Sequence, residues 1–166
     1  MSQFTLQGKP ITLLGNRVKK GDQAPDFTVL AHDQKPVSLR DTGGGVRIFC
    51  AVPSLDTPVC DQQTRRFNEE AASLDDVTIW TVSVDLPFAQ NRWCGAAGIE
   101  KVQTVSDHRD LSFGNAYGVV IKELRLLARS VFVVDRSDRL VHVEYVAEMS
   151  QYPDFEAVLE AAAKAG

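Results

Sequence analysis

The chain has 166 residues, a hydrophobic content of 44% and a formal net charge of −4. This length predicts a single domain, residues 1–166, large enough to bury its own core, and the negative charge without any basic run argues against a nucleic acid partner. No apolar stretch approaches the ~20 residues that span a bilayer and the N-terminus lacks the layout of a secretory signal, so we expect a cytoplasmic protein with no membrane contact.

The first element in the chain is a predicted β-hairpin at the N-terminus. Phe4 and Leu6 lie before the turn residues Gly8-Lys9-Pro10, and Ile11 and Leu13 follow them. Apolar runs bounded by turn residues then predict strands at residues 27–31, 46–52, 77–84 and 102–105. Apolar residues with a helical period predict helices from residue 58 onward, at 87–94 with an end at Gly95, at 110–117, and through 155–162.

Strands that alternate with helices are typical of an α/β protein. Near the C-terminus, residues 130–135 and 140–146 are expected to pair as an antiparallel hairpin before the last helix. Crossover helices between parallel strands, combined with this hairpin, predict a mixed sheet flanked by helices.

The most informative segment runs from Pro53 to Cys60, between a predicted central strand and the first helix. Thr57 is a good N-cap, and Pro58 suits the first helical position because proline has no N–H to lose and its φ fits a helix. Cys60 is therefore expected in the first turn, where unpaired N–H groups and the positive end of the helix dipole favour a thiolate. The thiolate is the nucleophilic form, so Cys60 is a candidate nucleophile.

A helix end alone stabilises a charge by typically ~0.3–1 kcal/mol and at best ~2 kcal/mol, so we expect a cation to help activate Cys60. Arg65 and Arg66 are rotated by about 140° and 240° around the helix from this cysteine and point away from it. Arg129, at the start of the apolar run 130–134, is the candidate that we favour. The other arginines that the sequence leaves open are Arg47, Arg92 and Arg125.

The buried face of this helix is expected to carry Cys60, Thr64, Phe67, Ala71 and Leu74, at three- and four-residue spacing. Cys94 is expected in the last turn of its own helix, where the dipole opposes a thiolate, so Cys60 would attack and Cys94 would react second. Cys50 lies inside a predicted strand, and we interpret it as a core residue.

The spacing from Pro53 through Thr57 to Cys60 resembles the active-site loop of the peroxiredoxins. The stretches Asp-Leu-Pro-Phe-Ala-Gln at 85–90 and Arg-Trp-Cys-Gly at 92–95 resemble the thiol peroxidase subfamily, the atypical two-cysteine peroxiredoxins of bacteria. Residues 127–135 are similar to the segment that carries the active-site arginine of that subfamily. The resemblance covers essentially the whole chain.

This resemblance implies a thioredoxin fold with an N-terminal hairpin extension, a homodimer, and a peroxidase that serves antioxidant defence. Cys60 would be the peroxidatic cysteine, and Cys94 would resolve its sulfenic acid through an intrachain disulfide. Thr57 and Arg129 would hold the thiolate and the peroxide, and Pro53 would shield the pocket from water. The substrates would be hydrogen peroxide and alkyl or lipid hydroperoxides, and thioredoxin would be the reductant.

A bulky peroxide also requires an apolar groove near the thiol. We expect Leu55, Phe88 and Trp93 to line such a groove, although these side chains would also suit the core or a dimer contact.

Three other functions remain open from the residues alone. A thiol–disulfide oxidoreductase would be expected to use Cys-x-x-Cys, but Thr57 stands three residues before Cys60. A module that only senses redox state would use the same pair, Cys60 and Cys94. A metal-binding module is the least favoured of the three functions, because the histidines show no ligand spacing with the cysteines. These histidines are His32, His108 and His142. We therefore predict no metal and no cofactor.

Overall fold

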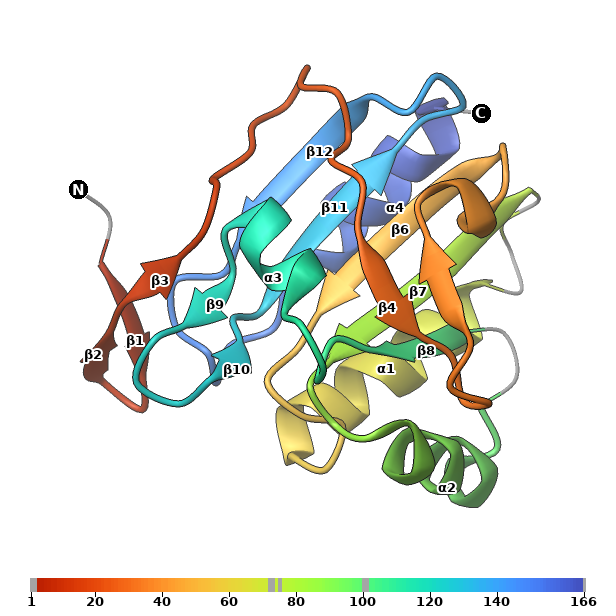
Figure 1. The fold of residues 1–166 in the computed structure, drawn as a ribbon. Coiled ribbons are helices and arrows are strands. Elements are labelled where there is room, and N and C mark those ends of the chain that lie inside the picture. Colours follow the sequence, from red (N-terminus) through yellow and green to blue (C-terminus); the bar gives the residue numbers. More distant parts are fainter. Residues whose placement is uncertain (1–2, 72–73, 75, 100–101, 166) are drawn as a thin grey trace.

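The computed structural model describes residues 3–71, 74, 76–99 and 102–165 (Figure 1). Its largest sheet has seven strands in the order β12-β11-β6-β7-β8-β4-β5. In chain order these strands are β4 (Thr28–Leu30), β5 (Pro36–Ser38), β6 (Val46–Ala51), β7 (Val77–Ser83), β8 (Val102–Ser106), β11 (Ser130–Val134) and β12 (Leu140–Tyr145). The β6, β7 and β8 strands are parallel and the other pairings are antiparallel, which confirms the predicted mixed sheet.

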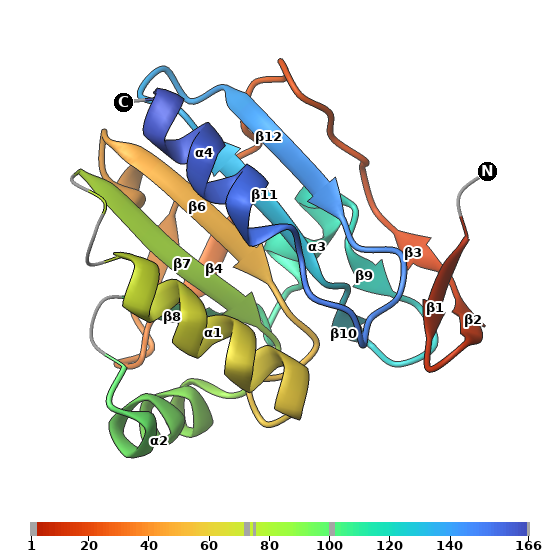
Figure 2. The ribbon, with the colours of Figure 1, turned by 180° about the vertical axis from the view of Figure 1, so that it is seen from behind.

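Helices cover both faces of this sheet. The α1 helix (Pro58–Ala71) and the α4 helix (Phe155–Ala165) lie on the face seen in Figure 2, and the short α3 helix (Ser112–Tyr117) lies on the face seen in Figure 1. The α2 helix (Pro87–Ala97) packs against β8, towards the sheet edge that β4 and β5 extend. No helix in the described ranges is long and apolar enough to cross a membrane.

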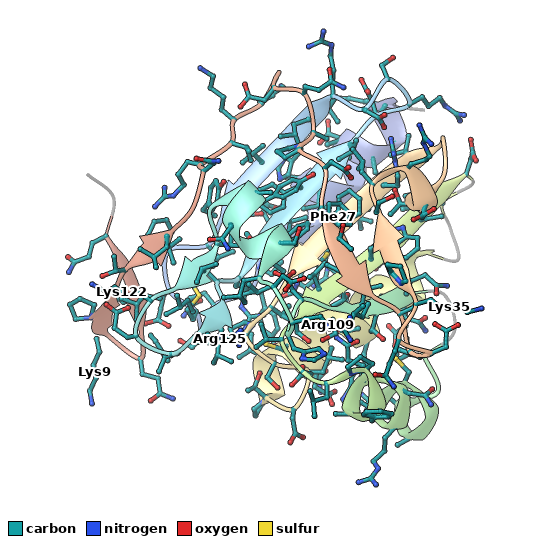
Figure 3. The ribbon with its side chains drawn as sticks, viewed as in Figure 1. Lys9, Phe27, Lys35, Arg109, Lys122 and Arg125 are labelled. Carbon is teal, nitrogen blue, oxygen red and sulfur yellow. The ribbon has the colours of Figure 1, made fainter. Side chains whose placement is uncertain are left out.

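The central strand β6 is buried along its whole length because both of its faces are covered. Phe49 belongs to the core on the α3 side, where Phe27 lies in the middle of the molecule (Figure 3) with its ring centroid 5.4 Å from that of Phe49. Ile48 and Cys50 point to the other side and pack with residues of α1 and α4. A strand buried on two faces reads as a continuous apolar run, which is why the sequence predicted it.

The predicted N-terminal hairpin is present as β1 (Phe4–Leu6) and β2 (Lys9–Ile11), with Phe4 opposite Ile11. The prediction was wrong for Leu13, which belongs to a separate three-stranded sheet and pairs with Ile121. The strands of that sheet are β3 (Leu13–Leu14), β9 (Val120–Ile121) and β10 (Leu126–Leu127). Two-residue strands are too short to show an alternating pattern, so the sequence did not predict them.

The buried face predicted for α1 is present at Cys60, Thr64 and Phe67. Leu74 lies beyond the end of the helix, and the side chain of Ala71 lies outside the described part of the structure. The sequence also missed β5 and the 3₁₀ turn over Arg40–Thr42 that follows it.

The α2 helix ends later than predicted. Gly95 stays helical, and Gly98 adopts the left-handed conformation (φ 69°) that ends the helix, with its N–H donating to the carbonyl oxygen of Cys94. Two glycines three residues apart both fit a C-terminal position, and only the backbone geometry distinguishes them. Cys94 still begins the last turn, as expected.

The α3 helix begins at Ser112 and not at Asp110. Leu111 has a positive φ of 51°, which interrupts a helix. The carboxylate of Asp107 accepts hydrogen bonds from the N–H groups of Phe113 and Gly114, at 3.0 and 2.8 Å, and so satisfies donors that the first turn leaves open.

Candidate active site

Cys60 is the third residue of α1, in the turn where the chain enters the helix from the loop after β6. The N–H of Asp61 donates to the carbonyl oxygen of Thr57 at 2.9 Å, so Thr57 occupies the N-cap position and Pro58 the first helical position. The Cys60 side chain is fully buried and packs with Val52 and Leu55. The thiol thus sits at the positive end of a helix, in surroundings that exclude water.

Arg129, between β10 and β11, points its guanidinium at this thiol. Its Nη2 atom lies 3.1 Å from the Sγ atom of Cys60, and the arginine is only 2% exposed. A positive charge at this distance favours the thiolate form of a cysteine over the thiol form. Of the arginines that the sequence left open, Arg129 is therefore the one that the structure places at the thiol.

The remaining arginines lie elsewhere. Arg47 is buried at the other end of β6, where it binds Asp138. Arg125 donates to a carbonyl oxygen beside α3, and Arg92 is exposed. Arg65 forms an ion pair with a carboxylate of α1, and the guanidinium of Arg66 lies 4.1 Å from the ring centroid of Phe155. Both side chains therefore point away from Cys60, as predicted.

Two residues that sequence reasoning missed hold Arg129 in place. Gln63 accepts a hydrogen bond from Nη1 at 2.6 Å, and the carbonyl oxygen of Met149 accepts one from Nε at 2.9 Å. The thioether of Met149 also lies 3.1 Å from the backbone N–H of Arg129. The sequence held a signal for Gln63, because this residue lies one helical turn after Cys60. It held no signal for Met149, which lies in a loop 20 residues after Arg129.

The loop of Met149 is in turn tied to the N-terminal hairpin. The N–H of Met149 donates to the carbonyl oxygen of Thr5 at 2.9 Å. The neighbouring Glu148 carboxylate accepts hydrogen bonds from Ser150, from the N–H of Gly8 and from the Thr5 hydroxyl. The hairpin therefore supports Arg129 through two successive hydrogen bonds, from Met149 to Thr5 and from Arg129 to Met149.

This anchor predicts an acid-sensitive contribution to stability. Hydrogen bonds, first from Ser150 and then from Gly8, lower the pKa of Glu148 to about 2. Because the pKa of the folded state lies below that of the unfolded state, the stabilisation is complete above about pH 4.5 and is lost as the pH falls towards 2. We expect the difference in urea midpoint between the native chain and Glu148→Gln to shrink over that range. A difference that stays constant from pH 6 to pH 2 would contradict this account.

The loop between β6 and α1 is fixed by Asp85, which follows β7. Its carboxylate accepts hydrogen bonds from the hydroxyl of Ser54 at 2.6 Å, the N–H of Leu55 at 2.8 Å and the hydroxyl of Ser83 at 2.7 Å. Thr57 donates its hydroxyl hydrogen to the carbonyl oxygen of Ser54 at 2.9 Å. Pro53 lies half-buried at the start of this loop. The loop is thus connected directly to the segment that leads into α2.

A hollow of about 480 Å³ opens beside this loop, between the loop and α2. It is lined by Ser54, Leu55, Asp56, Asp85, Ala89, Gln90, Arg92, Trp93 and Ala96. Leu55 and Trp93 lie together here, as expected for an apolar groove, and the indole N–H of Trp93 donates to Asp61 in α1 at 3.0 Å. Phe88 is not among the lining residues and is 65% exposed.

Cys94 and Cys50 are both buried, and all three cysteines are free thiols. The Sγ atom of Cys94 lies 3.3 Å from the hydroxyl of Thr104 in β8. Burial raises the pKa of the Cys94 thiol, and this hydrogen bond partly opposes the shift. Burial likewise raises the pKa of Cys50, which lies in the core as expected. In the described ranges no three side chains of histidine, cysteine, aspartate or glutamate gather as a metal ion would require.

Comparison with known proteins agrees with this geometry. The family model described as Redoxin matches residues 19–159. A thiol peroxidase of Halalkalibacterium halodurans is 62% identical over 162 residues, covering 98% of each chain, and one of Bacillus subtilis is 60% identical over the same length. The chain belongs to the thiol peroxidases of the redoxin family. This confirms the predicted family and the enzyme class, a peroxidase that works through a thiol.

Solved structures confirm the predicted thioredoxin-like fold. A peroxiredoxin-like protein from Aquifex aeolicus superposes with a TM-score of 0.93 at 35% identity, covering 100% of this chain and 98% of that one. The thiol peroxidase from Chromobacterium violaceum has a TM-score of 0.88 at 18% identity, over 95% of this chain and 93% of that chain, which is a likeness of fold.

Proposed function

We propose that this thiol peroxidase reduces hydrogen peroxide and organic hydroperoxides with Cys60 as the peroxidatic cysteine. The observation that carries the proposal is the contact between the Nη2 atom of Arg129 and the Sγ atom of Cys60, 3.1 Å long and buried. No other cysteine in the described ranges combines a helix N-terminus with a guanidinium. Cys50 is enclosed in the core, and Cys94 lies at the opposite end of its helix.

In the first step the Cys60 thiolate attacks the terminal oxygen of the peroxide. An S–O bond forms, the O–O bond breaks, and the leaving oxygen departs with its electron pair and is protonated to water or an alcohol, which leaves a sulfenic acid on Cys60. Negative charge develops on the leaving oxygen, and the Arg129 guanidinium and the N–H groups of α1 stabilise it. Thr57 has its hydroxyl hydrogen committed to Ser54, so its lone pairs are free to accept the O–H of the peroxide. Pro53 shields the reacting atoms from water.

The hollow beside the active-site loop suits the organic part of a hydroperoxide. Leu55 and Trp93 supply apolar surface there, and Leu55 also packs against Cys60. This arrangement supports alkyl and lipid hydroperoxides as substrates in addition to hydrogen peroxide. Phe88, which is exposed on the outside of α2, suits contact with a second copy in a homodimer better than a role in the groove.

In the second step Cys94 attacks the sulfenic acid and forms an intrachain disulfide with Cys60. The two Cα atoms must come within about 7 Å, yet each cysteine lies in a helix and has its own partner, Arg129 for Cys60 and Thr104 for Cys94. We therefore expect the first turn of α1 and the last turn of α2 to unwind. The disulfide closes a loop of about 35 residues, which in the chain-entropy model stabilises the oxidised chain against unfolding by roughly 3.5–4 kcal/mol, and the cost of unwinding the two turns offsets part of this gain.

A cytoplasmic thiol peroxidase with this disulfide needs a reductant, and we propose thioredoxin. Unwinding of α2 brings the disulfide out of the buried site, where a dithiol protein reaches it. Turnover would thus restore the two thiols seen in this structure and serve antioxidant defence.

Mass spectrometry after one equivalent of peroxide tests this cycle. We expect a disulfide between Cys60 and Cys94 within one chain. In Cys94→Ser we expect about one equivalent of peroxide to be consumed per chain, after which Cys60 remains as sulfenic acid or oxidises further, because no second thiol traps it. Steady turnover by Cys94→Ser with thioredoxin, or a disulfide between two chains, would contradict the proposed resolving step.

A further inference from the structure

A chain of hydrogen-bonding groups leads from the Cys94 thiol to an imidazole. The Sγ atom of Cys94 lies 3.3 Å from the Oγ1 atom of Thr104, and the same Oγ1 atom lies 2.5 Å from the Nε2 atom of His32. The three residues come from α2, from β8 and from the turn between β4 and β5. Figures 1 and 2 show this turn beside α2, and Lys35 marks it in Figure 3.

Burial decreases along this chain of groups. Cys94 is 8% exposed and Thr104 is 4% exposed, whereas His32 is half-buried. The thiol has little direct access to water, so a proton that leaves it needs a protein group to accept it. A threonine hydroxyl donates and accepts hydrogen bonds at the same time, so Thr104 has the chemistry to pass a proton between its two neighbours.

Burial favours the neutral form of the His32 imidazole. Burial, the largest effect, lowers the pKa of His32 below its ordinary value, while a hydrogen bond with Asn91 of α2 and the charge of Asp33 oppose the shift. Asp33 is itself paired with Lys35 in the same turn. At neutral pH the ring therefore keeps a lone pair, which Nε2 presents to Thr104 when the proton is on the other nitrogen.

We propose that Thr104 and His32 form a proton relay that deprotonates Cys94 for its attack on the Cys60 sulfenic acid. This inference rests on the proposed function, because it requires Cys94 to be the resolving thiol. Thr104 touches the reacting sulfur, and His32 acts through Thr104.

The Cys94 proton passes to Thr104 as the Thr104 hydroxyl proton passes to His32, which leaves a thiolate and an imidazolium. The electron pair of the thiolate forms the S–S bond, and the S–O bond of Cys60 breaks with its electron pair on oxygen. That oxygen takes up a proton, finally the one held by His32, so the products are one disulfide and one water.

Deprotonation also promotes the movement that the step requires. A thiolate at the buried position of Cys94 lies at the negative end of α2, and Thr104 separates it from the imidazolium of His32, so it is unfavourable where it forms. The charge therefore favours unwinding of the last turn of α2, and the nucleophile is released in its reactive form.

The test is the rate of disulfide formation in His32→Gln, followed by stopped-flow fluorescence of the tryptophans over a range of pH. In the native chain we expect this rate to increase as the pH is raised towards neutrality, because His32 loses its proton over this range, and then to level off. In His32→Gln we expect that inflection to vanish and the rate at pH 7 to fall about tenfold or more. The earlier phase, in which Cys60 reacts with peroxide, serves as the reference for folded enzyme.

Matched variants separate a relay from a structural role. Thr104→Ser keeps the hydroxyl and should keep most of the rate, whereas Thr104→Val keeps the shape and should slow the step as His32→Gln does. Added imidazole should restore part of the rate in His32→Ala. An unchanged pH profile, or faster disulfide formation in His32→Gln, would overturn the relay, since the contact would then only hold Cys94 in place. A native chain that forms no Cys60–Cys94 disulfide would instead contradict the proposed function.

Discussion

Replacement of Cys60 by serine is expected to reduce peroxide consumption to the rate of the uncatalysed reaction. Serine has nearly the same shape, so the buried site next to Val52 and Leu55 should stay packed. Its hydroxyl is not ionised at neutral pH and has no base beside it, because the group that contacts Cys60 is the guanidinium of Arg129. Peroxide loss in the presence of dithiothreitol measures this effect without depending on the identity of the natural reductant.

Cys50→Ala is the matched control for this experiment. Cys50 is also a buried cysteine, but it lies in β6 and packs with residues of the α1 and α4 side of the core. Its removal should lower the free energy of unfolding modestly and leave peroxide consumption intact. If Cys60→Ser kept more than a trace of the activity, or Cys50→Ala lost it, Cys60 would not be the peroxidatic residue.

Replacement of Arg129 by methionine is expected to slow the reaction of Cys60 with peroxide by about 10²–10³-fold, the range seen when one preorganised donor to a developing negative charge is removed. Two effects contribute to this loss of rate, since the guanidinium stabilises the thiolate before the reaction and the leaving oxygen during the reaction. Single-turnover stopped-flow with excess peroxide measures the rate without the reductant.

Two further variants show whether the loss is one of charge or of structure. Arg129→Lys keeps the charge but cannot reach Cys60, Gln63 and Met149 together, so we expect a rate between those of the native chain and Arg129→Met. Met149→Leu keeps the carbonyl oxygen that holds Nε and removes only the thioether, and it should retain most of the rate. Equal rates in Arg129→Met and the native chain would assign the stabilisation to the end of α1 alone.

The sequence pointed to the segment around Cys60 because the main features of this segment are local. The order threonine, proline, cysteine places Cys60 in the first turn of a helix whatever the rest of the chain does, since capping depends on neighbouring backbone groups. The central strand was equally clear, because burial on both faces produces the continuous apolar run of β6. The predicted end of α2 at Gly95 was wrong because a second glycine, Gly98, fits the same signal.

Residues that reach the site from distant segments were harder to predict. Gln63 lies on the same helix as Cys60, but its contribution to the site depends on the position of the Arg129 guanidinium, to which it is hydrogen-bonded. Met149 belongs to a loop held by the N-terminal hairpin, and no periodic pattern marks a loop carbonyl as a ligand for an arginine. Leu55 and Trp93 line one hollow, whereas Phe88 on the same helix as Trp93 points to solvent, and the role of this hollow in binding a peroxide stays a prediction.

The sequence by itself determined the α/β class, the helix that begins at Pro58, and the need of Cys60 for a cation that its own helix does not supply. These follow from the period of apolar residues and from the limited strength of a helix dipole, which are properties of short segments. The tertiary structure placed the guanidinium of Arg129 against Cys60, and it placed the Thr104 hydroxyl between Cys94 and His32. Such choices depend on contacts between segments far apart in the chain, and those contacts exist only once the mixed sheet has brought the segments together.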